Sequence, residues 1–315
     1  MKSNMARPAI LVTGSDLAPE ALAILKDFDI SYAGARPTEA DLIASVQKLD
    51  PVAIIVRYGR ITPAVIDAGK SLKVISKHGS GIDTIDVEHA QKRSVTVRAA
   101  VGANATAVAE HTVTLLLACA KSITTLNART HEGHWDKSTH KSMELKGRTL
   151  GLIGLGAIGR KVADFAHAFG MNIVGYDPFG NLMPNYISLV DLETIWKVSD
   201  AISLHCPLTT ENADLINRDA IEKMKSGVIL VNTARGGLIN EHALLDGLNS
   251  GKIKSAGIDS FKQEPPDQGH PFFGHPQIIL TPHIGGVSTD AYINMGCGAA
   301  QNIVDVLSEQ SLPSN

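Results

Sequence analysis

The segment Gly154-Leu155-Gly156-Ala157-Ile158-Gly159 constrains the fold of this chain most strongly, because of the pattern that surrounds it. An apolar run over 149–153 leads directly into the glycines and is typical of a buried strand. Apolar residues then recur at helical spacing as far as Gly170, and a second apolar run over 172–176 ends in Asp177. The order strand, G-x-G-x-x-G, helix, strand and acid is that of a dinucleotide-binding βαβ unit.

Each glycine of this segment has a separate physical role. Gly154 allows a tight turn, Gly156 lets the backbone approach a pyrophosphate, and Gly159 lets the helix pack closely on the strand. The pyrophosphate would lie on the free amides at the start of the helix, where Ala157 and Ile158 stand. A lone glycine motif is often an ordinary turn, but five elements in the right order favour a bound dinucleotide.

The acid that ends the second strand predicts which dinucleotide binds. Asp177 follows Gly159 by 18 residues, where a carboxylate accepts hydrogen bonds from both ribose hydroxyls of the adenosine. A 2′-phosphate would meet a like charge there, and residues 178–181 contain no lysine or arginine to compensate. We therefore predict NAD rather than NADP, the alternative being that Asp177 is an ordinary turn residue.

Composition places the chain among ordinary globular proteins. It has 315 residues, enough for two domains, of which 44% are hydrophobic and 19% charged. A net charge of −3 argues against a nucleic-acid partner or a membrane surface. Cys119, Cys206 and Cys297 form no C-x-x-C pair and are interpreted as buried thiols of a reducing compartment. We expect a cytoplasmic protein with no metal site, no signal peptide and no membrane span.

Short apolar runs alternate with helical patterns, which is typical of a parallel α/β sheet covered on both faces. The first part of the chain is expected to form strands at 9–12, 30–32, 52–56, 72–75 and 95–97, and helices at 19–26, 39–49 (with Thr38 as its cap) and 63–68. The second part is expected to form six strands, at 149–153, 172–176, 201–205, 228–232, 255–259 and 278–281, with later helices at 218–224 and 241–250. Six is the number in a doubly wound Rossmann fold.

Two longer helical patterns predict the domain organisation. One, over 105–128, joins the two parts, and the other, over 289–307, follows the last strand and could return to the first part. The expected fold class is therefore α/β with two domains. A smaller, flavodoxin-like parallel α/β substrate domain would comprise 1–103 with 287–315, and a Rossmann NAD-binding domain 104–286. A cleft between such domains is where a small ligand usually binds.

Three polar side chains follow successive strands of the second part. Arg235 comes after 228–232, Glu264 after 255–259 and His283 after 278–281. Each taken alone could be a solvated or packed loop residue. Because ligands bind outside the carboxyl ends of the strands in an open α/β sheet, a shared site is the better interpretation.

These three residue types suit hydride transfer to and from a 2-hydroxy acid. The histidine titrates near neutrality and can serve as the acid/base for the proton that accompanies the hydride. The carboxylate would orient it and stabilise its imidazolium form. The arginine can bind a substrate carboxylate or carbonyl through two parallel hydrogen bonds.

The chain resembles the D-isomer-specific 2-hydroxyacid dehydrogenases over nearly its whole length, and most of all their phosphoglycerate dehydrogenase branch. The segments that carry the resemblance are HGSGID (78–83), NATAVAEHT (104–112), GLGAIG (154–159), YDP (176–178), HCPLT (205–209), VNTARGG (231–237), EPP (264–266) and PHIGG (282–286). The resemblance implies an NAD-dependent enzyme for a substrate similar to 3-phosphoglycerate, acting as a homodimer built around the 105–128 helix region. The regulatory domains of the longer relatives are not expected.

The resemblance also assigns roles to individual residues. His283 would be the acid/base, Glu264 its partner and Arg235 the group that binds the substrate, while the Ser80-Gly81 backbone would bind the substrate carboxylate. Further cofactor-binding positions implied by the resemblance are Pro207, Thr233, Asp259 and Gly285.

Cations near the strand ends of the first part suggest a second anionic or polar group on the substrate. Arg57 and Arg60 follow the strand expected at 52–56, and Lys77 follows the one expected at 72–75. The resemblance places a basic residue at Lys77 near the substrate phosphate. Alternatively, Arg57 makes an interdomain contact and Arg60 is solvated.

Other functions remain open at this point. A hydroxypyruvate or glyoxylate reductase of broad specificity would differ only in what the first domain recognises, and phosphite oxidation uses a similar set of residues. Formate is disfavoured, because Glu264 stands where formate-oxidising members have glutamine. From another class, NAD-sensing corepressor scaffolds share the fold and the catalytic residues, but they carry extra partner-binding segments that this chain lacks.

Overall fold

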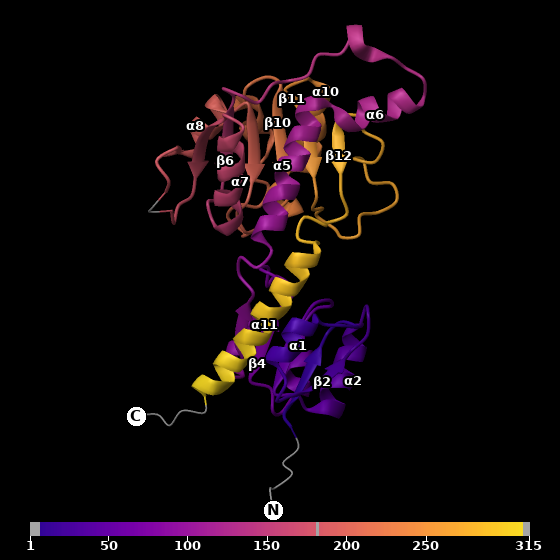
Figure 1. Ribbon diagram of the computed structural model, residues 1–315, viewed down its shortest axis with the longest axis vertical. Helices are drawn as coiled ribbons and strands as arrows, with labels where there is room; N and C mark the ends of the chain where they lie inside the picture. Colours follow the sequence, from indigo (N-terminus) through magenta and orange to yellow (C-terminus); the bar gives the residue numbers. More distant parts are fainter. Residues whose placement is uncertain (1–6, 181–182, 311–315) are drawn as a thin grey trace, which may run out of the picture. The chain divides into compact units, whose positions relative to one another are not determined.

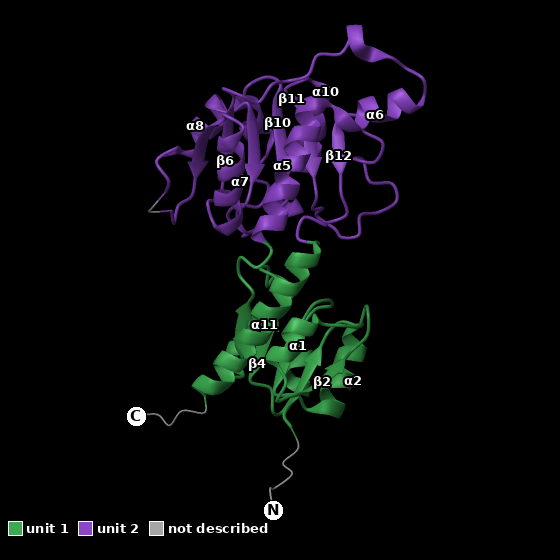
Figure 2. Ribbon diagram, in the orientation of Figure 1, with its two compact units in different colours: residues 1–104, 287–315 green, residues 105–286 purple. Residues whose placement is uncertain are grey.

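The computed structural model describes residues 7–180 and 183–310. The chain divides into two compact units, shown in different colours in Figure 2. Unit 1 comprises 1–104 with 287–315, and unit 2 comprises 105–286.

Unit 1 is built on a five-stranded parallel sheet with the strand order β2-β1-β3-β4-β5. Its strands are β1 Ala9–Val12, β2 Asp29–Tyr32, β3 Ala53–Val56, β4 Val74–Lys77 and β5 Thr96–Ala99. Its helices are α1 Pro19–Ile24, α2 Glu39–Leu49, α3 Pro63–Ala68, α4 Val87–Lys92 and α11 Thr289–Glu309. This flavodoxin-like order puts a topological switch point between β1 and β3.

Both faces of the unit 1 sheet are buried, because alternate strand residues pack into opposite layers. Ile10 and Val12 pack with residues of α1 and α11, whereas Leu11 packs with residues of α2 and α3. The long C-terminal helix α11, yellow in Figure 1, thus supplies a layer that the first hundred residues lack. Thr38 caps α2 as predicted, since its hydroxyl accepts from the amide of Asp41 at 3.2 Å.

Unit 2 is built on a seven-stranded parallel sheet with the order β12-β11-β10-β9-β6-β7-β8. Its strands are β6 Thr149–Ile153, β7 Asn172–Tyr176, β8 Ile187–Leu189, β9 Ala201–Leu204, β10 Val228–Asn232, β11 Ile253–Ile258 and β12 Ile278–Leu280. Its helices are α5 Ala105–Lys121, α6 Ile123–His131, α7 Ala157–Ala168, α8 Leu192–Val198, α9 Arg218–Lys223 and α10 Glu241–Asn249, with 3-10 turns at Asp136–Ser138 and Gly236–Leu238. Helices α5 and α7 cover one face of the sheet (Figure 1), and α8, α9 and α10 pack on the other.

This is the doubly wound Rossmann arrangement with one strand more than predicted. The strand missed by the sequence analysis is β8, a three-residue edge strand in which only Ile187 is buried. Helix α4 was missed for a similar reason, since Ala90 is its only fully buried residue. Such short elements show too few apolar positions for a period to be visible.

Other predicted elements are shifted or divided, such as the strand expected at 255–259, which is β11 Ile253–Ile258. The strand expected at 72–75 is β4 Val74–Lys77, so Lys77 ends the strand instead of following it. Pairing with β3 extends β4 over polar residues, and Ser76 is completely buried there. The helix expected over 105–128 is interrupted at Ser122, whose left-handed backbone (φ 52°) separates α5 from α6.

Candidate active site

The strands β10, β11 and β12 of unit 2 each end in a turn that carries one of the predicted catalytic side chains. Arg235 follows β10, Glu264 follows β11 and His283 follows β12. The strands are parallel neighbours in the sheet, so their carboxyl ends bring the three turns to one edge.

Asn232, the last residue of β10, shapes the turn that carries Arg235. Its buried side-chain amide donates to the Arg235 carbonyl oxygen at 2.9 Å and accepts from the backbone amide of Ala234 at 3.0 Å. Next in the turn, Gly236 lies against the backbone that follows β11: a Cβ at Gly236 would be 2.0 Å from the carbonyl carbon of Phe261. No larger residue fits, so glycine allows the two turns to pack backbone against backbone.

Both carboxylate oxygens of Glu264 have hydrogen-bond partners. Oε1 accepts from the amide of Phe261 at 3.0 Å, and Oε2 lies 2.7 Å from Nδ1 of His283. Burial alone would raise the pKa of Glu264. Hydrogen bonds from His283 and Phe261, with the positive charges of His283 and Arg235, outweigh burial and leave the pKa lowered. The carboxylate is therefore ionised at neutral pH.

His283 is oriented by this pair. Its hydrogen bond to Glu264 raises the pKa of His283 above the usual value, against the opposing effects of burial and of Arg235, and the charges of Glu264 and Asp259 add to the rise. Because Nδ1 faces the carboxylate, Nε2 is the ring nitrogen that can exchange a proton with a bound molecule. The backbone of His283 is left-handed (φ 54°), which is uncommon for a residue other than glycine.

Asp259 fixes the turn that follows β12. It is 1% exposed. Its Oδ1 accepts from the Thr281 hydroxyl at 2.6 Å and the Ile284 amide at 2.9 Å, and its Oδ2 accepts from the Gly285 amide at 2.9 Å. Burial would raise the pKa of Asp259, but these hydrogen bonds and one from His111 lower it to about 2. A charged carboxylate thus holds the Thr281 side chain before His283 and two backbone amides after it.

A pocket of about 410 Å³ lies beside Glu264 and His283. Its remaining lining residues are apolar apart from one threonine: Phe261, Pro265, Pro266, Phe273, Leu280, Thr281 and Pro282. Hydrogen bonds and ion pairs are electrostatically stronger beside such a wall than in water. The His283–Glu264 pair therefore stands at the edge of a largely apolar cavity.

The glycine turn has the geometry that a dinucleotide needs. Gly154 has φ 94°, and a Cβ on it would lie 2.7 Å from the amide nitrogen of Cys206. A Cβ on Gly159 would lie 2.1 Å from the Gly154 carbonyl oxygen, so this glycine allows close packing of α7 on the turn. A Cβ on Gly156 would meet nothing within 4 Å, so there is open space beside this glycine at the start of α7, which begins with Ala157 and Ile158. These residues fit a bound pyrophosphate.

Asp177 lies at the end of β7 beside this turn. Its Oδ2 accepts from the Leu155 amide at 2.7 Å and its Oδ1 accepts from the Phe179 amide at 2.9 Å. The carboxylate is thereby held at the adenosine end of the predicted cofactor site. Asn181, part of the segment used to predict NAD, lies outside the described residues.

The other predicted cofactor positions also lie at strand ends of unit 2. Pro207 follows β9, and its carbonyl oxygen accepts from the side-chain amide of Asn212 at 2.8 Å. Thr233 follows β10 and is buried, with its hydroxyl 2.8 Å from that of Thr112 in α5. Like Gly285, which follows β12, these residues lie at the same carboxyl ends of the strands as the turns that carry Arg235, Glu264 and His283.

The predicted substrate-binding residues lie in unit 1. The Ser80 hydroxyl donates to the Asn104 side chain at 3.1 Å, next to Gly81. The Lys77 ammonium donates to the Arg57 carbonyl oxygen at 3.4 Å. Arg60 is exposed.

Arg57 is engaged within unit 1. Its guanidinium forms an ion pair with Asp16 and stacks on the Tyr292 ring at 5.0 Å, leaving the side chain 11% exposed. Asp16 is therefore the acidic partner of Arg57 within unit 1. The two predicted roles of Arg57, substrate binding and an interdomain contact, did not include this ion pair.

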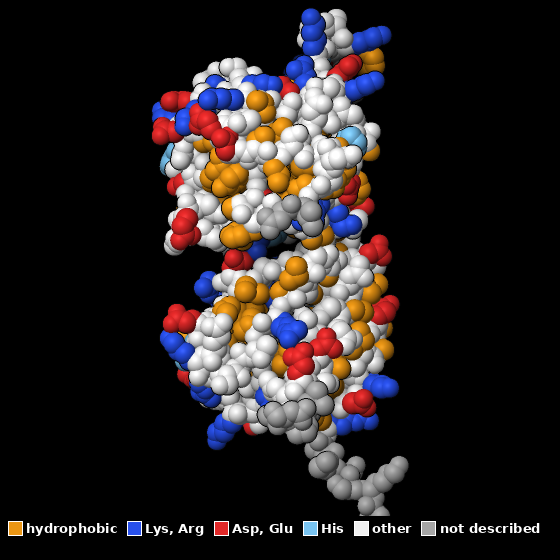
Figure 3. All heavy atoms as spheres, turned by 90° about the vertical axis from the view of Figure 1, so that its left-hand side faces the viewer, with side chains coloured by type: hydrophobic (Ala, Val, Ile, Leu, Met, Phe, Trp, Pro, Cys, Tyr) orange, Lys and Arg blue, Asp and Glu red, His pale blue; other side chains and the backbone are white. Residues whose placement is uncertain are grey.

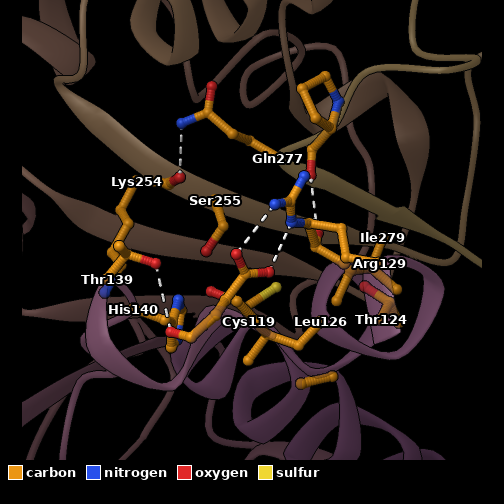
Figure 4. Close-up of a pocket in the computed structure, with 15 residues that line it drawn as sticks. Cys119, Thr124, Leu126, Arg129, Thr139, His140, Lys254, Ser255, Gln277 and Ile279 are labelled. Carbon is orange, nitrogen blue, oxygen red and sulfur yellow. Dashed lines mark hydrogen bonds and ion pairs between the residues drawn. The ribbon is translucent and has the colours of Figure 1, made fainter. Parts of the chain in front are cut away.

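A second pocket of unit 2, of about 360 Å³, lies among α5, α6, β11 and β12 (Figure 4). Arg129 binds both carboxylate oxygens of Asp136 there, at 2.6 and 2.9 Å, and Ser255 of β11 contributes to the lining. No predicted catalytic or cofactor-binding residue lines this pocket. It is separate from the catalytic turns.

Within the described ranges, no helix is long and apolar enough to cross a membrane. The same residues contain no group of three or more His, Cys, Asp and Glu side chains placed to hold a metal ion. On the face shown in Figure 3, basic and acidic side chains are interspersed.

Fold and site together define the class of protein. A doubly wound sheet with a dinucleotide turn, and a histidine–glutamate pair at its strand ends, is the architecture of a nicotinamide-dependent dehydrogenase. Residues 113–285 match the family described as D-isomer specific 2-hydroxyacid dehydrogenase, NAD binding domain. The chain belongs to this family.

Individual proteins show the same likeness. The chain is 40% identical over 289 residues to hydroxypyruvate reductase of Thermotoga maritima, covering 91% of this chain and 94% of that one. It is 39% identical over 306 residues to D-3-phosphoglycerate dehydrogenase of Methanocaldococcus jannaschii, covering 95% of this chain but only 57% of the relative. The crystal structure of the TT0316 protein from Thermus thermophilus matches with a TM-score of 0.88 at 34% identity, covering 97% and 99% of the two chains.

These matches confirm the predicted fold class, family and cofactor. The protein is an enzyme that uses NAD for oxidoreduction between D-2-hydroxy acids and 2-keto acids. Family membership thus favours the enzyme over the scaffold. Sequence reasoning missed His111, which lies in the NATAVAEHT segment but follows no strand, so only the folded structure shows its contacts with the site.

Proposed function

We propose that this enzyme reduces a short, unphosphorylated 2-keto acid of the hydroxypyruvate and glyoxylate type with NADH. In this proposal Arg235, Glu264 and His283 form the catalytic set. The observation that carries it is the 2.7 Å contact between His283 Nδ1 and Glu264 Oε2, which leaves Nε2 as a positioned, protonatable group at the edge of a pocket. That is the geometry of a histidine acid/base.

The proposed chemistry divides between cofactor and protein. NAD, when bound by the glycine turn and Asp177, supplies or accepts the hydride at C2 of the substrate. In reduction, protonated His283 donates from Nε2 to the C2 oxygen as negative charge develops there. Glu264 stabilises the imidazolium before the transfer, and Arg235 binds the carboxylate and polarises the carbonyl.

The choice of an unphosphorylated substrate rests on Arg57. An arginine that already has a carboxylate partner and a stacked aromatic ring is less suited to bind a substrate phosphate than an unpaired one. The likeness to a hydroxypyruvate reductase over nearly the full length of both chains also supports this choice. A phosphorylated substrate is the second candidate, because Arg60 is exposed and Lys77 lies beside the backbone of Arg57.

A substrate panel distinguishes these candidates. Catalytic efficiency would be measured for hydroxypyruvate, glyoxylate and 3-phosphohydroxypyruvate, each with NADH and with NADPH. We expect the two small acids to be preferred, and NADH to be preferred because a 2′-phosphate would meet Asp177.

An Arg60→Ala, Lys77→Ala double variant serves as the internal comparison. We expect it to keep the wild-type order of substrates. A wild-type preference for the phosphorylated acid that disappears in the double variant would favour the second candidate, and equal use of NADPH would contradict the role of Asp177. The assignment of the substrate carboxylate to Ser80-Gly81 stays a prediction.

We also propose a homodimer in the cytoplasm. Support for the dimer comes from α6 and the segment after it, which extend away from the rest of unit 2 in Figure 1. Ile123 and Trp135 in this region are 55% and 79% exposed, as expected for side chains that a second copy covers. Support for the location comes from the free thiols of Cys119, Cys206 and Cys297, which suit a reducing compartment.

A further inference from the structure

We propose that His111 of α5 is a positioning residue for the turn that carries His283, acting through Thr281 and Asp259. The inference rests on the proposed function, because it concerns the same catalytic histidine. His111 lies in a helix and was not among the site residues predicted from the sequence.

The contacts of His111 form a directed chain of hydrogen bonds. Its Nε2 lies 3.0 Å from the Thr281 hydroxyl oxygen and 3.4 Å from Oδ1 of Asp259. The Thr281 hydroxyl donates its one hydrogen to Asp259, so its oxygen accepts from His111. His111 therefore carries its proton on Nε2 and donates into the group that anchors the catalytic turn.

The His111 ring also shapes the far side of that turn. A Cβ on Gly285 would lie 3.0 Å from Asp259 Oδ2, 3.5 Å from Cδ2 of the His111 ring and 3.7 Å from Val108 Cγ1. The ring thus hydrogen-bonds to Thr281 and lines the space into which a side chain at position 285 would project. Thr281 and Gly285 are on either side of His283, whose left-handed backbone is uncommon for a residue other than glycine.

Helix α5 supports a second catalytic turn in the same way. Thr112, the neighbour of His111, pairs its hydroxyl with that of Thr233 at 2.8 Å, at the end of β10 and two residues before Arg235. Successive residues of one helix therefore hydrogen-bond to the strand ends that carry the arginine and the histidine. If α5 sets the position of both turns, removal of the His111 donor should loosen the His283–Glu264 contact.

The test is the pH dependence of keto-acid reduction in His111→Phe and His111→Gln. Phenylalanine fills the space without a donor, whereas the glutamine amide can replace the Nε2 donor. Exposed His242 on α10 gives the matched control, His242→Phe. The charged groups that act on His283 are Glu264, Asp259 and Arg235, and none of them is altered in these variants.

We expect His111→Phe to lower kcat/KM about tenfold, as for loss of one hydrogen bond, and to move the alkaline limb about half a pH unit or more downward. His111→Gln should restore both kcat/KM and the position of the alkaline limb, and His242→Phe should match wild type in both quantities. A lower rate with an unmoved limb in His111→Phe would overturn the inference, since a merely structural role predicts that result. If His111→Phe does not fold, Thr281→Val removes the hydroxyl that links His111 to Asp259. The shift of its alkaline limb then decides in the same way. Wild-type enzyme inactive on every keto acid would instead contradict the proposed function.

Discussion

At the scale of single residues, the site depends on the hydrogen bonds that engage both carboxylate oxygens of Glu264. One carboxylate oxygen accepts from a backbone amide and the other faces His283, so the glutamate cannot turn away without losing a hydrogen bond. This arrangement explains why the pKa of His283 is raised although burial opposes the charged form.

Replacing Glu264 by glutamine should move the pH profile in a defined direction. In reduction the imidazolium is required, so activity is present below the pKa of His283 and is lost as pH rises through it. A neutral partner no longer favours the imidazolium, so the pKa falls and activity should be lost at a lower pH than in wild type. Initial rates measured across the pH range check this, and a limb that stays in place or moves upward would rule out the pair as described.

At the scale of elements, the turn after β10 and the turn after β11 act as one piece. The contact that joins them is between backbones, at Gly236 and Phe261, and no side-chain rotation can relieve an added methyl group there.

Gly236→Ala should therefore cost about 1–3 kcal/mol in the free energy of unfolding, as overpacking does, and should reduce turnover because Arg235 and Glu264 move together. Gly269→Ala is the matched control, because a Cβ at this exposed glycine meets nothing within 4 Å. Chemical denaturation and steady-state kinetics on both variants test the contact. Equal behaviour of the two alanine variants would show that the turns can separate without consequence.

Elements with a strong apolar signal could be predicted from the sequence. The five residues of β10 are all buried, and the glycine turn combines φ 94° at Gly154 with close contacts that exclude side chains. The edge strand β8 could not be predicted, since only Ile187 of its three residues is buried. The contact between His111 and Thr281 could not be predicted either, because the two residues are 170 positions apart in the sequence. They meet because α5 packs beside β11 and β12.

At the scale of the whole molecule, each unit has its own parallel sheet and its own core, and α11 completes unit 1 from the far end of the chain. Every predicted catalytic side chain lies in unit 2, while the predicted substrate-binding residues lie in unit 1. Substrate choice and hydride chemistry should therefore respond to different sets of substitutions.

The proposed dimer predicts a solution mass of twice the 33.4 kDa of the chain. Light scattering on the purified protein measures this mass. Trp135→Glu, which puts a charge on the 79% exposed ring position, should shift the equilibrium towards the monomer. A wild-type mass of one chain at micromolar concentration would contradict the dimer.

The central claim is that His283 transfers the proton in NAD-dependent reduction of a 2-keto acid. The most direct measurement compares wild type and His283→Asn on the preferred keto acid, with NADH affinity determined separately by fluorescence titration. Loss of a general acid/base predicts a fall in kcat of about 10²–10⁴-fold with NADH affinity little changed. Near-wild-type turnover in His283→Asn would contradict the mechanism.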